Sequence, residues 1–177
     1  MYDSKYDGKC RGCRLAHGLD TTTGGFIPLG AYWMVNHNGG SEAFLGWLVM
    51  QPRQHRTKLS EFTDEELREF GIQTQRLEKA LCETWPKVQP NDPIERVYVA
   101  LFSESVLEKH DYWHIHFHVV PRTKSIGKEQ PTPEEQKLGI KDHKGWYIVR
   151  QATYPRKLDD KAINELMDKL RKHLCAH

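Results

Sequence analysis

The sequence predicts an α+β domain with an antiparallel β-sheet, a long helix and a C-terminal helix. Three observations lead to this fold class. Several short segments are rich in β-branched and aromatic residues, as strands are. Two longer segments repeat apolar residues at helical spacing. The segments alternate as strands, helix, strands and helix, an order typical of helices gathered on one side of an antiparallel sheet.

Two strands are expected before the long helix. About the first thirty residues are dominated by Gly, Asp, Thr and Lys and predict a loop. Residues 31–35 predict a strand, and residues 36–40 predict a turn because Asn and Gly tolerate positive φ. Residues 44–50 are apolar nearly throughout and stop at Pro52, which predicts a central strand covered on both faces.

The long helix is expected to begin at the capping box formed by Thr63 and Glu66 and to run to about Trp85. A second amphipathic helix is expected over 158–174. The predicted buried stripes are Leu67, Phe70, Thr74, Leu77 and Leu81 in the first helix, and Ala162, Ile163, Leu166, Met167 and Leu170 in the second.

Further strands are expected at 97–102 and, as a short addition, at 145–149. The stretch 123–144 is polar and predicts a surface excursion. We expect one domain, in which residues 1–122 carry the main motifs and 123–177 add the polar excursion and a helix packed on the same domain.

The segment His114-Ile115-His116-Phe117-His118-Val119-Val120 alternates histidine with apolar residues. Successive side chains of a strand point to opposite faces, so a strand here places all three imidazoles on one face and the apolar residues in the core. Core packing does not require three histidines on one surface. The simpler interpretation is a solvated strand face that happens to carry them.

Charge and hydropathy exclude several classes of function. The formal charge is +2, from 26 basic and 24 acidic residues, which gives no footprint for extended nucleic acid. No apolar run resembles a signal peptide or a membrane helix. We therefore expect a soluble cytoplasmic protein without a membrane partner.

Cys10 and Cys13 have the spacing of a zinc knuckle, but a closed tetrahedral site needs two more ligands. His17 and His110 are candidates by position in the sequence. Two free thiols or a redox pair are the alternatives, although the βαβ context expected for a redox pair is missing.

Three pieces of the chain resemble the histidine triad superfamily of nucleotide hydrolases and transferases. Residues 114–120 match its signature, in which three histidines alternate with apolar residues. Residues 46–55 are similar to its Gly-His-Thr-Leu-Val-Ile-Pro-Lys-Arg-His strand and turn, and residues 59–67 are similar to its helix entry. The resemblance covers about residues 10–122 and implies the triad fold, with a zinc loop at its N-terminus, and a homodimer.

A neutral imidazole can attack phosphorus and so divide one displacement into two easier steps. The resemblance implies that His116 is the nucleophile at an α-phosphate and forms a covalent nucleotidyl intermediate. It implies that His118 contacts the phosphate or the bridging oxygen, and that His114, the first histidine of the triad, belongs to the same catalytic group. It also implies a structural zinc ion, held by Cys10, Cys13, His55 and His114.

The sequence departs from the family before the triad. Ser103, His110 and Asp111 occupy places where the family has an Asn, a Gln and a Ser or Thr that handle substrate. Asn36 or Asn38 replaces the acidic residue that commonly binds ribose. These residues are candidates for substrate binding, and the departures bear on the substrate more than on the nucleophile.

We expect hydrolysis of dinucleoside polyphosphates or related nucleotides. A phosphorylase or nucleotide-sugar transferase is the alternative within the superfamily. Alternatives of other classes are a catalytically silent nucleotide-binding protein and a catalytic metal site formed by the three histidines in another fold. The last requires bending, because a straight strand separates the first and third histidines by roughly 13 Å.

Overall fold

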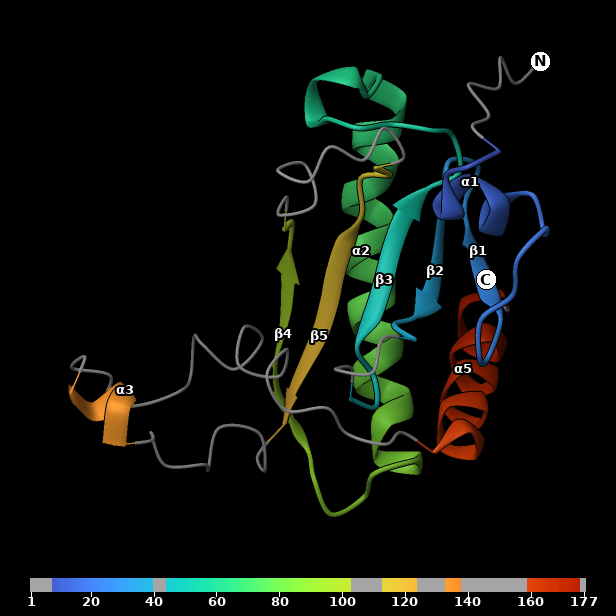
Figure 1. Ribbon diagram of the computed structural model, residues 1–177. Coiled ribbons are helices and arrows are strands. Elements are labelled where there is room, and N and C mark those ends of the chain that lie inside the picture. Colours follow the sequence, from blue (N-terminus) through green and yellow to red (C-terminus); the bar gives the residue numbers. More distant parts are fainter. Residues whose placement is uncertain (1–7, 40–43, 103–112, 124–132, 138–158, 176–177) are drawn as a thin grey trace.

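The computed structural model describes residues 8–39, 44–102, 113–123, 133–137 and 159–175. Its centre is a five-stranded antiparallel sheet with the strand order β1-β2-β3-β5-β4 (Figure 1). The predicted α+β class is therefore confirmed, and β3 is the predicted central strand. The strands are β1 (Phe26–Leu29), β2 (Trp33–His37), β3 (Leu48–Pro52), β4 (Ile94–Ala100) and β5 (Phe117–Thr123).

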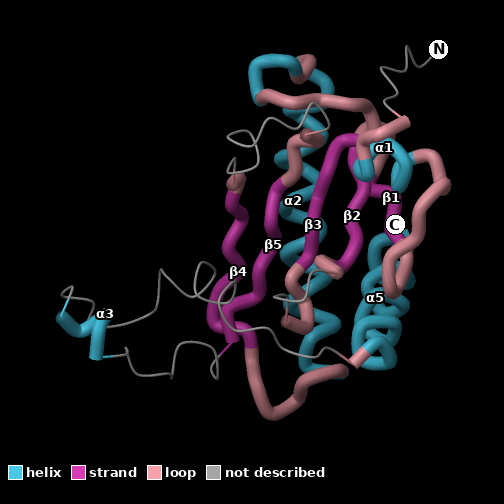
Figure 2. Tube along the Cα trace, in the orientation of Figure 1, coloured by secondary structure: helices cyan, strands magenta, loops and turns pink. Residues whose placement is uncertain are grey.

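Two helices cover one face of the sheet (Figure 2). The long helix α2 (Asp64–Thr84) packs against β2 and against α5 (Asp160–Cys175), which also contacts β1 and β2. The short α1 (Arg11–Ala16) lies at one end of the sheet, and α3 (Pro133–Lys137) lies apart from it (Figure 1). Short 3-10 turns at Leu59–Glu61 and Trp85–Lys87 flank α2.

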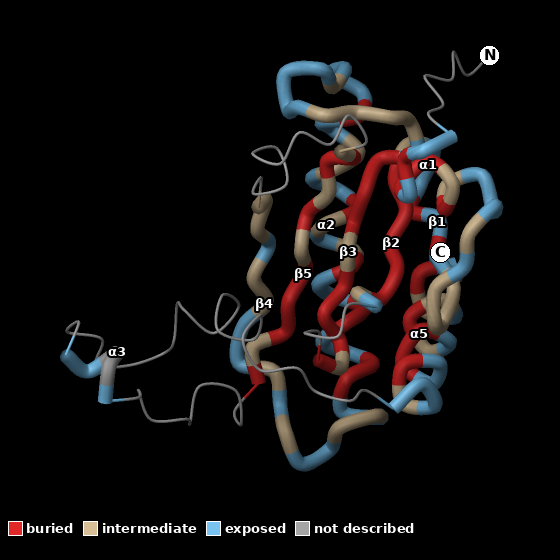
Figure 3. Tube along the Cα trace, in the orientation of Figure 1, coloured by how far each residue is buried: buried red, intermediate tan, exposed pale blue. Residues whose placement is uncertain are grey.

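The register of the central strands separates a core face from an open face. Val35 pairs with Met50, which pairs with Phe117, and these three side chains join the hydrophobic core beneath α2 and α5. The neighbouring row runs from Asn36 through Val49 to His118 on the opposite face, because directly paired residues share a face of the sheet. Figure 3 shows that β2, β3 and β5 are mostly buried, whereas β4 at the edge is more exposed.

The start of α2 follows from its sequence. The Thr63 hydroxyl accepts the Glu66 N–H at 3.2 Å, and the Thr63 N–H donates to the Glu66 carboxylate at 2.8 Å, which confirms the predicted capping box. The same carboxylate pairs with Arg56 at 3.1 Å, and both side chains are largely buried. The Arg56 carbonyl in turn accepts the Ile115 N–H at 2.8 Å, so this pair ties α2 to the histidine segment.

Several sequence-based boundaries were wrong. β1 and α1 lie within the segment predicted to be a loop. β5 begins at Phe117, so His114 and His116 precede the strand rather than lie within it. Leu67 was expected to be buried but is 45% exposed, because the first turn of α2 packs through Glu66 instead.

Some predictions fall outside the described residues, namely the strand at 145–149 and most of the polar stretch 123–144. Ser103, His110 and Asp111 are also outside them. In the part of the chain that the structure describes, none of the helices has the length and apolar character needed to span a membrane.

Candidate active site and metal centre

Cys10, Cys13, His55 and His114 converge at one end of the sheet, with their ligand atoms within 4.8 Å of one another. The Nδ1 of His114 lies 3.3 Å from the Cys10 sulfur and 3.7 Å from the Cys13 sulfur. The Nδ1 of His55 lies 3.3 Å from the Cys13 sulfur. Two sulfurs and two imidazole nitrogens at these separations match the donor set of a tetrahedral zinc site.

Three separate segments bring these ligands together. Cys10 and Cys13 lie at the start of α1, His55 follows β3, and His114 precedes β5. Gly12 between the cysteines permits the close approach, because a Cβ there would lie only 2.5 Å from Cγ of the His114 ring. A side chain at residue 12 would therefore displace the His114 ring from the cluster.

Hydrogen bonding prepares His114 to bind a metal. Its Nε2 lies 2.9 Å from the Pro52 carbonyl, which can only accept, so the ring proton is on Nε2 and the lone pair on Nδ1 faces the sulfurs. Burial lowers the pKa of His114 to about 4, which favours the neutral ring. Burial also raises the pKa of the Cys10 thiol to about 11, and a bound divalent cation would offset this by stabilising the thiolate. The residues thus fit a zinc ion.

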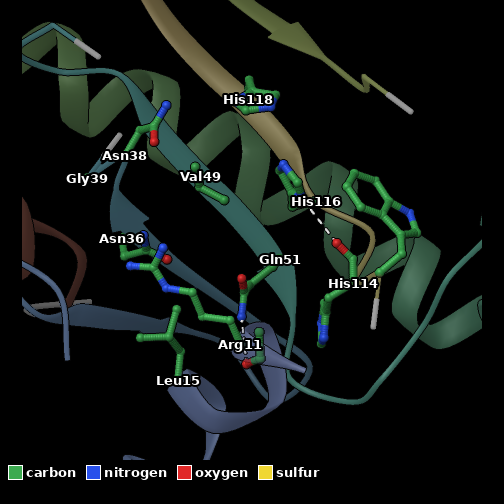
Figure 4. A pocket seen from close by; sticks show the side chains of 12 residues that line it. Arg11, Leu15, Asn36, Asn38, Gly39, Val49, Gln51, His114, His116 and His118 are labelled. Atoms are coloured by element: carbon green, nitrogen blue, oxygen red, sulfur yellow. Dashed lines mark hydrogen bonds between the residues drawn. The ribbon is translucent and has the colours of Figure 1, made fainter. Parts of the chain in front are cut away.

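A cavity of about 250 Å³ opens on the other side of His114, over the open face of the sheet (Figure 4). Its floor is the row of Asn36, Val49 and His118, next to Gln51 and His116. The Gln51 amide donates to the Gly12 carbonyl at 3.0 Å, which joins this floor to α1. The remaining lining residues are Arg11, Gly12, Leu15, Asn38, Gly39, Trp113 and His114.

His116 is oriented by its own main chain. Its Nδ1–H donates to the His114 carbonyl at 3.0 Å, as the dashed line in Figure 4 shows. In the neutral ring, Nε2 then carries the lone pair. The ring lies against Trp113, with a centroid distance of 5.0 Å, and against His118, at 4.8 Å. His116 thus has the tautomer that a nucleophile needs.

His118 has the opposite arrangement. The indole N–H of Trp47 donates to its Nδ1 at 2.8 Å, so the proton of the neutral ring is on Nε2. Burial, with a smaller contribution from His116, lowers the pKa of His118 to about 4. His118 can therefore donate a hydrogen bond while neutral.

Polar groups also line the far side of the cavity. Arg11 supplies a cation from α1, and Figure 4 shows its side chain extending over the cavity. Asn36 is 5% exposed, its Nδ2 donates to the His37 carbonyl, and its Oδ1 has no hydrogen-bond partner among the residues that the structure describes. A buried acceptor of this kind is stabilised when a ligand supplies a donor, such as a hydroxyl group.

The structure places the predicted residues in two adjoining groups. The four predicted zinc ligands form the cluster, and Asn36, Asn38 and the three histidines line the cavity. His17 is not in the cluster, because its Nδ1 bonds the Cys13 carbonyl at 2.9 Å. His114 belongs to both groups. Its ring lies in the cluster, and its carbonyl accepts a hydrogen bond from His116 in the cavity.

Arg11, Gln51 and Trp47 were not predicted to take part. Arg11 could have been suspected from its place between the two cysteines. Trp47 and His118 lie 71 residues apart in the sequence, and only the pairing of β3 with β5 brings them together.

No protein-family model matches the sequence, and comparison with curated proteins gave no match. Solved structures do match over nearly the whole chain. A zinc-bound histidine triad family protein from Mycobacterium smegmatis aligns with a TM-score of 0.58 and 16% identity, covering 94% of each chain. The chain has the histidine triad fold.

Two further structures with this fold agree. A Hit-like protein involved in cell-cycle regulation from Bartonella henselae aligns with a TM-score of 0.57 and 16% identity, covering 95% of this chain and 98% of its own. A member of the HIT family from Bacillus subtilis aligns at 0.52 and 14% identity, covering 85% and 99%. The histidine triad fold therefore rests on the whole architecture as well as on the motif.

Proposed function

We propose that this chain is a histidine triad enzyme that hydrolyses or transfers nucleotides by attack on an α-phosphate, with dinucleoside polyphosphates or related nucleotides as substrates. The observation that carries the proposal is the orientation of His116, whose Nδ1–H is held by the His114 carbonyl so that the Nε2 lone pair serves as nucleophile in the cavity. The fold, shared with histidine triad proteins, supports the same assignment.

The reaction proceeds in two displacements. The lone pair of His116 Nε2 forms a bond to phosphorus, and the bond from phosphorus to the leaving oxygen breaks with its electron pair on that oxygen. Water or another acceptor then attacks the phosphorus, releases its proton to solvent and returns the electron pair to Nε2. His118 donates from Nε2 to a phosphoryl oxygen and stabilises the charge that develops there.

Substrate binding uses the other lining groups. Arg11 provides a cation for the phosphates, and Asn36 Oδ1 provides an acceptor for a sugar hydroxyl. We propose that Asn36 and Asn38 contact the ribose. The cavity volume of about 250 Å³ is close to the lower end of small-molecule sites and suits part of one nucleotide, not an extended nucleic acid.

Zinc has a structural role in this proposal. Four protein ligands leave no open position for water, so the metal is not expected to activate a nucleophile. A bound zinc ion would hold the His114 ring, and the His114 carbonyl accepts the hydrogen bond from His116. The four ligands would thus help to fix the orientation of the nucleophile from the opposite side of His114.

The test is to trap the intermediate. The purified protein is mixed with a labelled dinucleoside polyphosphate and quenched in alkali, and peptide mass spectrometry locates any nucleotidyl group. We expect a nucleotidyl group on His116 in the wild-type protein and loss of both adduct and turnover in His116→Ala. A protein that binds nucleotide and forms no product would support the silent binding alternative instead.

Products then distinguish hydrolysis from transfer. With labelled inorganic phosphate present, a nucleoside diphosphate that contains the label indicates a phosphorylase, whereas a nucleoside monophosphate without any labelled nucleotide indicates hydrolysis. We rank hydrolysis first. We also propose a homodimer, on the basis of the resemblance to histidine triad proteins, and sedimentation equilibrium of the purified chain tests it.

A further inference from the structure

The hydrogen bond between Trp47 and His118 determines what His118 can do. Trp47 directly precedes β3, is 6% exposed and packs against Phe44 with a centroid distance of 5.4 Å. Its indole N–H meets His118 Nδ1 at 2.8 Å, with the two rings nearly perpendicular at 72°. This is a short, partly buried bond between two rigid groups.

An indole nitrogen is a donor only, so it cannot accept a proton from His118 or supply one to it. As long as the bond exists, Nδ1 of His118 must be unprotonated and the ring must be neutral, with its proton on Nε2. Loss of that Nε2 proton would leave an imidazolate anion next to the transferring phosphate. His118 is therefore suited to donating a hydrogen bond and unsuited to giving away a proton.

The other titratable groups on the described lining of the cavity do not supply a proton either. His116 attacks through Nε2, and its Nδ1–H is bonded to the His114 carbonyl. The Nε2–H of His114 donates to the Pro52 carbonyl, outside the cavity. The guanidinium of Arg11 stays protonated throughout. The leaving group must then depart without being protonated by any of these side chains.

We propose that Trp47 is a positioning residue that keeps His118 a neutral Nε2–H donor, and that the enzyme consequently favours phosphoanhydrides over phosphoramidates as substrates. The inference rests on the proposed function. A phosphate leaving group has a second pKa near about 6 and is stable as the released anion, so the anhydride bond breaks with its electron pair on oxygen and no proton is needed. An amine leaving group must acquire a proton as the phosphorus–nitrogen bond breaks.

The first measurement is nitrogen NMR of the wild-type protein with labelled histidine. We expect His118 to show an unprotonated Nδ1 and a protonated Nε2, and His116 to show the reverse. This result does not depend on substrate, so it can hold even if the proposed function fails. A His118 ring protonated at Nδ1 would overturn the inference.

The second measurement compares kcat and KM for a dinucleoside polyphosphate and a nucleoside phosphoramidate. Wild type should cleave the anhydride faster. Trp47→Phe keeps the aromatic bulk and removes the donor, so His118 can be protonated at Nδ1. We expect kcat on the anhydride to fall about tenfold, the equivalent of one hydrogen bond. KM should stay unchanged because Trp47 is not among the residues that line the cavity.

The ratio of the two rates separates positioning from a general structural role. In Trp47→Phe we expect the preference for the anhydride to fall about tenfold, together with a change in the His118 nitrogen resonances. The control is Trp33→Phe, which removes an equivalent buried indole bond, 3.0 Å to the Glu66 carbonyl. It should lower stability and leave the ratio unchanged. A wild type that prefers the phosphoramidate, or an unchanged ratio in Trp47→Phe, would refute the proposal.

Discussion

Replacing Gly12 by alanine tests the geometry of the metal centre. A Cβ at residue 12 would lie 2.5 Å from Cγ and 2.6 Å from Nδ1 of His114, and ordinary contact begins at 3.4 Å. The His114 ring or α1 must therefore move by about 0.9 Å, several times the ~0.2 Å tolerance of a metal–ligand distance. Helix propensity acts in the opposite direction, since alanine stabilises a helix by up to about 1 kcal/mol relative to glycine.

We expect the steric effect to exceed the propensity effect, so that Gly12→Ala binds zinc about a hundredfold more weakly. Competition with a chromophoric chelator measures the affinity, and thermal unfolding with and without chelator measures the coupled stability. The matched control is Gly71→Ala in α2, where a Cβ would meet no atom of the described residues within 4 Å. The free energy of unfolding of this control should rise by up to about 1 kcal/mol, and its zinc affinity should equal that of the wild type. A Gly12→Ala protein with wild-type zinc affinity would refute the placement of α1 against His114.

Three further predictions concern the cavity and the buried charges. Arg11→Ala should raise KM for nucleotides about tenfold, with a smaller change in kcat, because it removes a charge-assisted hydrogen bond to the phosphates. The control Arg14→Ala removes a surface ion pair with Asp20 and should leave both constants unchanged. Burial lowers the pKa of His37 to about 4, so the folded protein favours the neutral ring. The free energy of unfolding should therefore be highest above pH ~6.5 and fall by about 3 kcal/mol as the pH falls to ~4. In denaturant titrations, the free energy of unfolding of His37→Gln should depend less on pH. Arg56→Gln should cost about 3 kcal/mol because it leaves the buried Glu66 carboxylate unpaired, and the double variant with Glu66→Gln should recover most of that loss in the same unfolding assay.

Local chemistry made the long helix and the histidine segment predictable. Thr63 and Glu66 specify the helix start by themselves, and the alternation of histidine with apolar residues places Ile115, Phe117 and Val119 in the core, as observed. The strand itself begins only at Phe117. Packing causes this difference, because the His114 ring points to the cysteines while its carbonyl bonds His116.

The elements that were missed depend on distant partners. β1 contains Pro28 and has only four residues, so its pattern is too short to read, and it forms by pairing with β2. α1 has six residues and is fixed by the cluster of its cysteines with His55 and His114. The Trp47–His118 bond depends on the register of β3 with β5, which no local pattern reveals.

The stereochemical course at phosphorus tests the central claim most directly. A substrate with a chiral α-phosphorothioate is cleaved in isotope-labelled water, and the configuration of the nucleoside phosphorothioate product is determined. Two in-line displacements, first by His116 Nε2 and then by water, predict retention of configuration. Inversion would mean that water attacks the substrate directly, and it would contradict a covalent intermediate on His116.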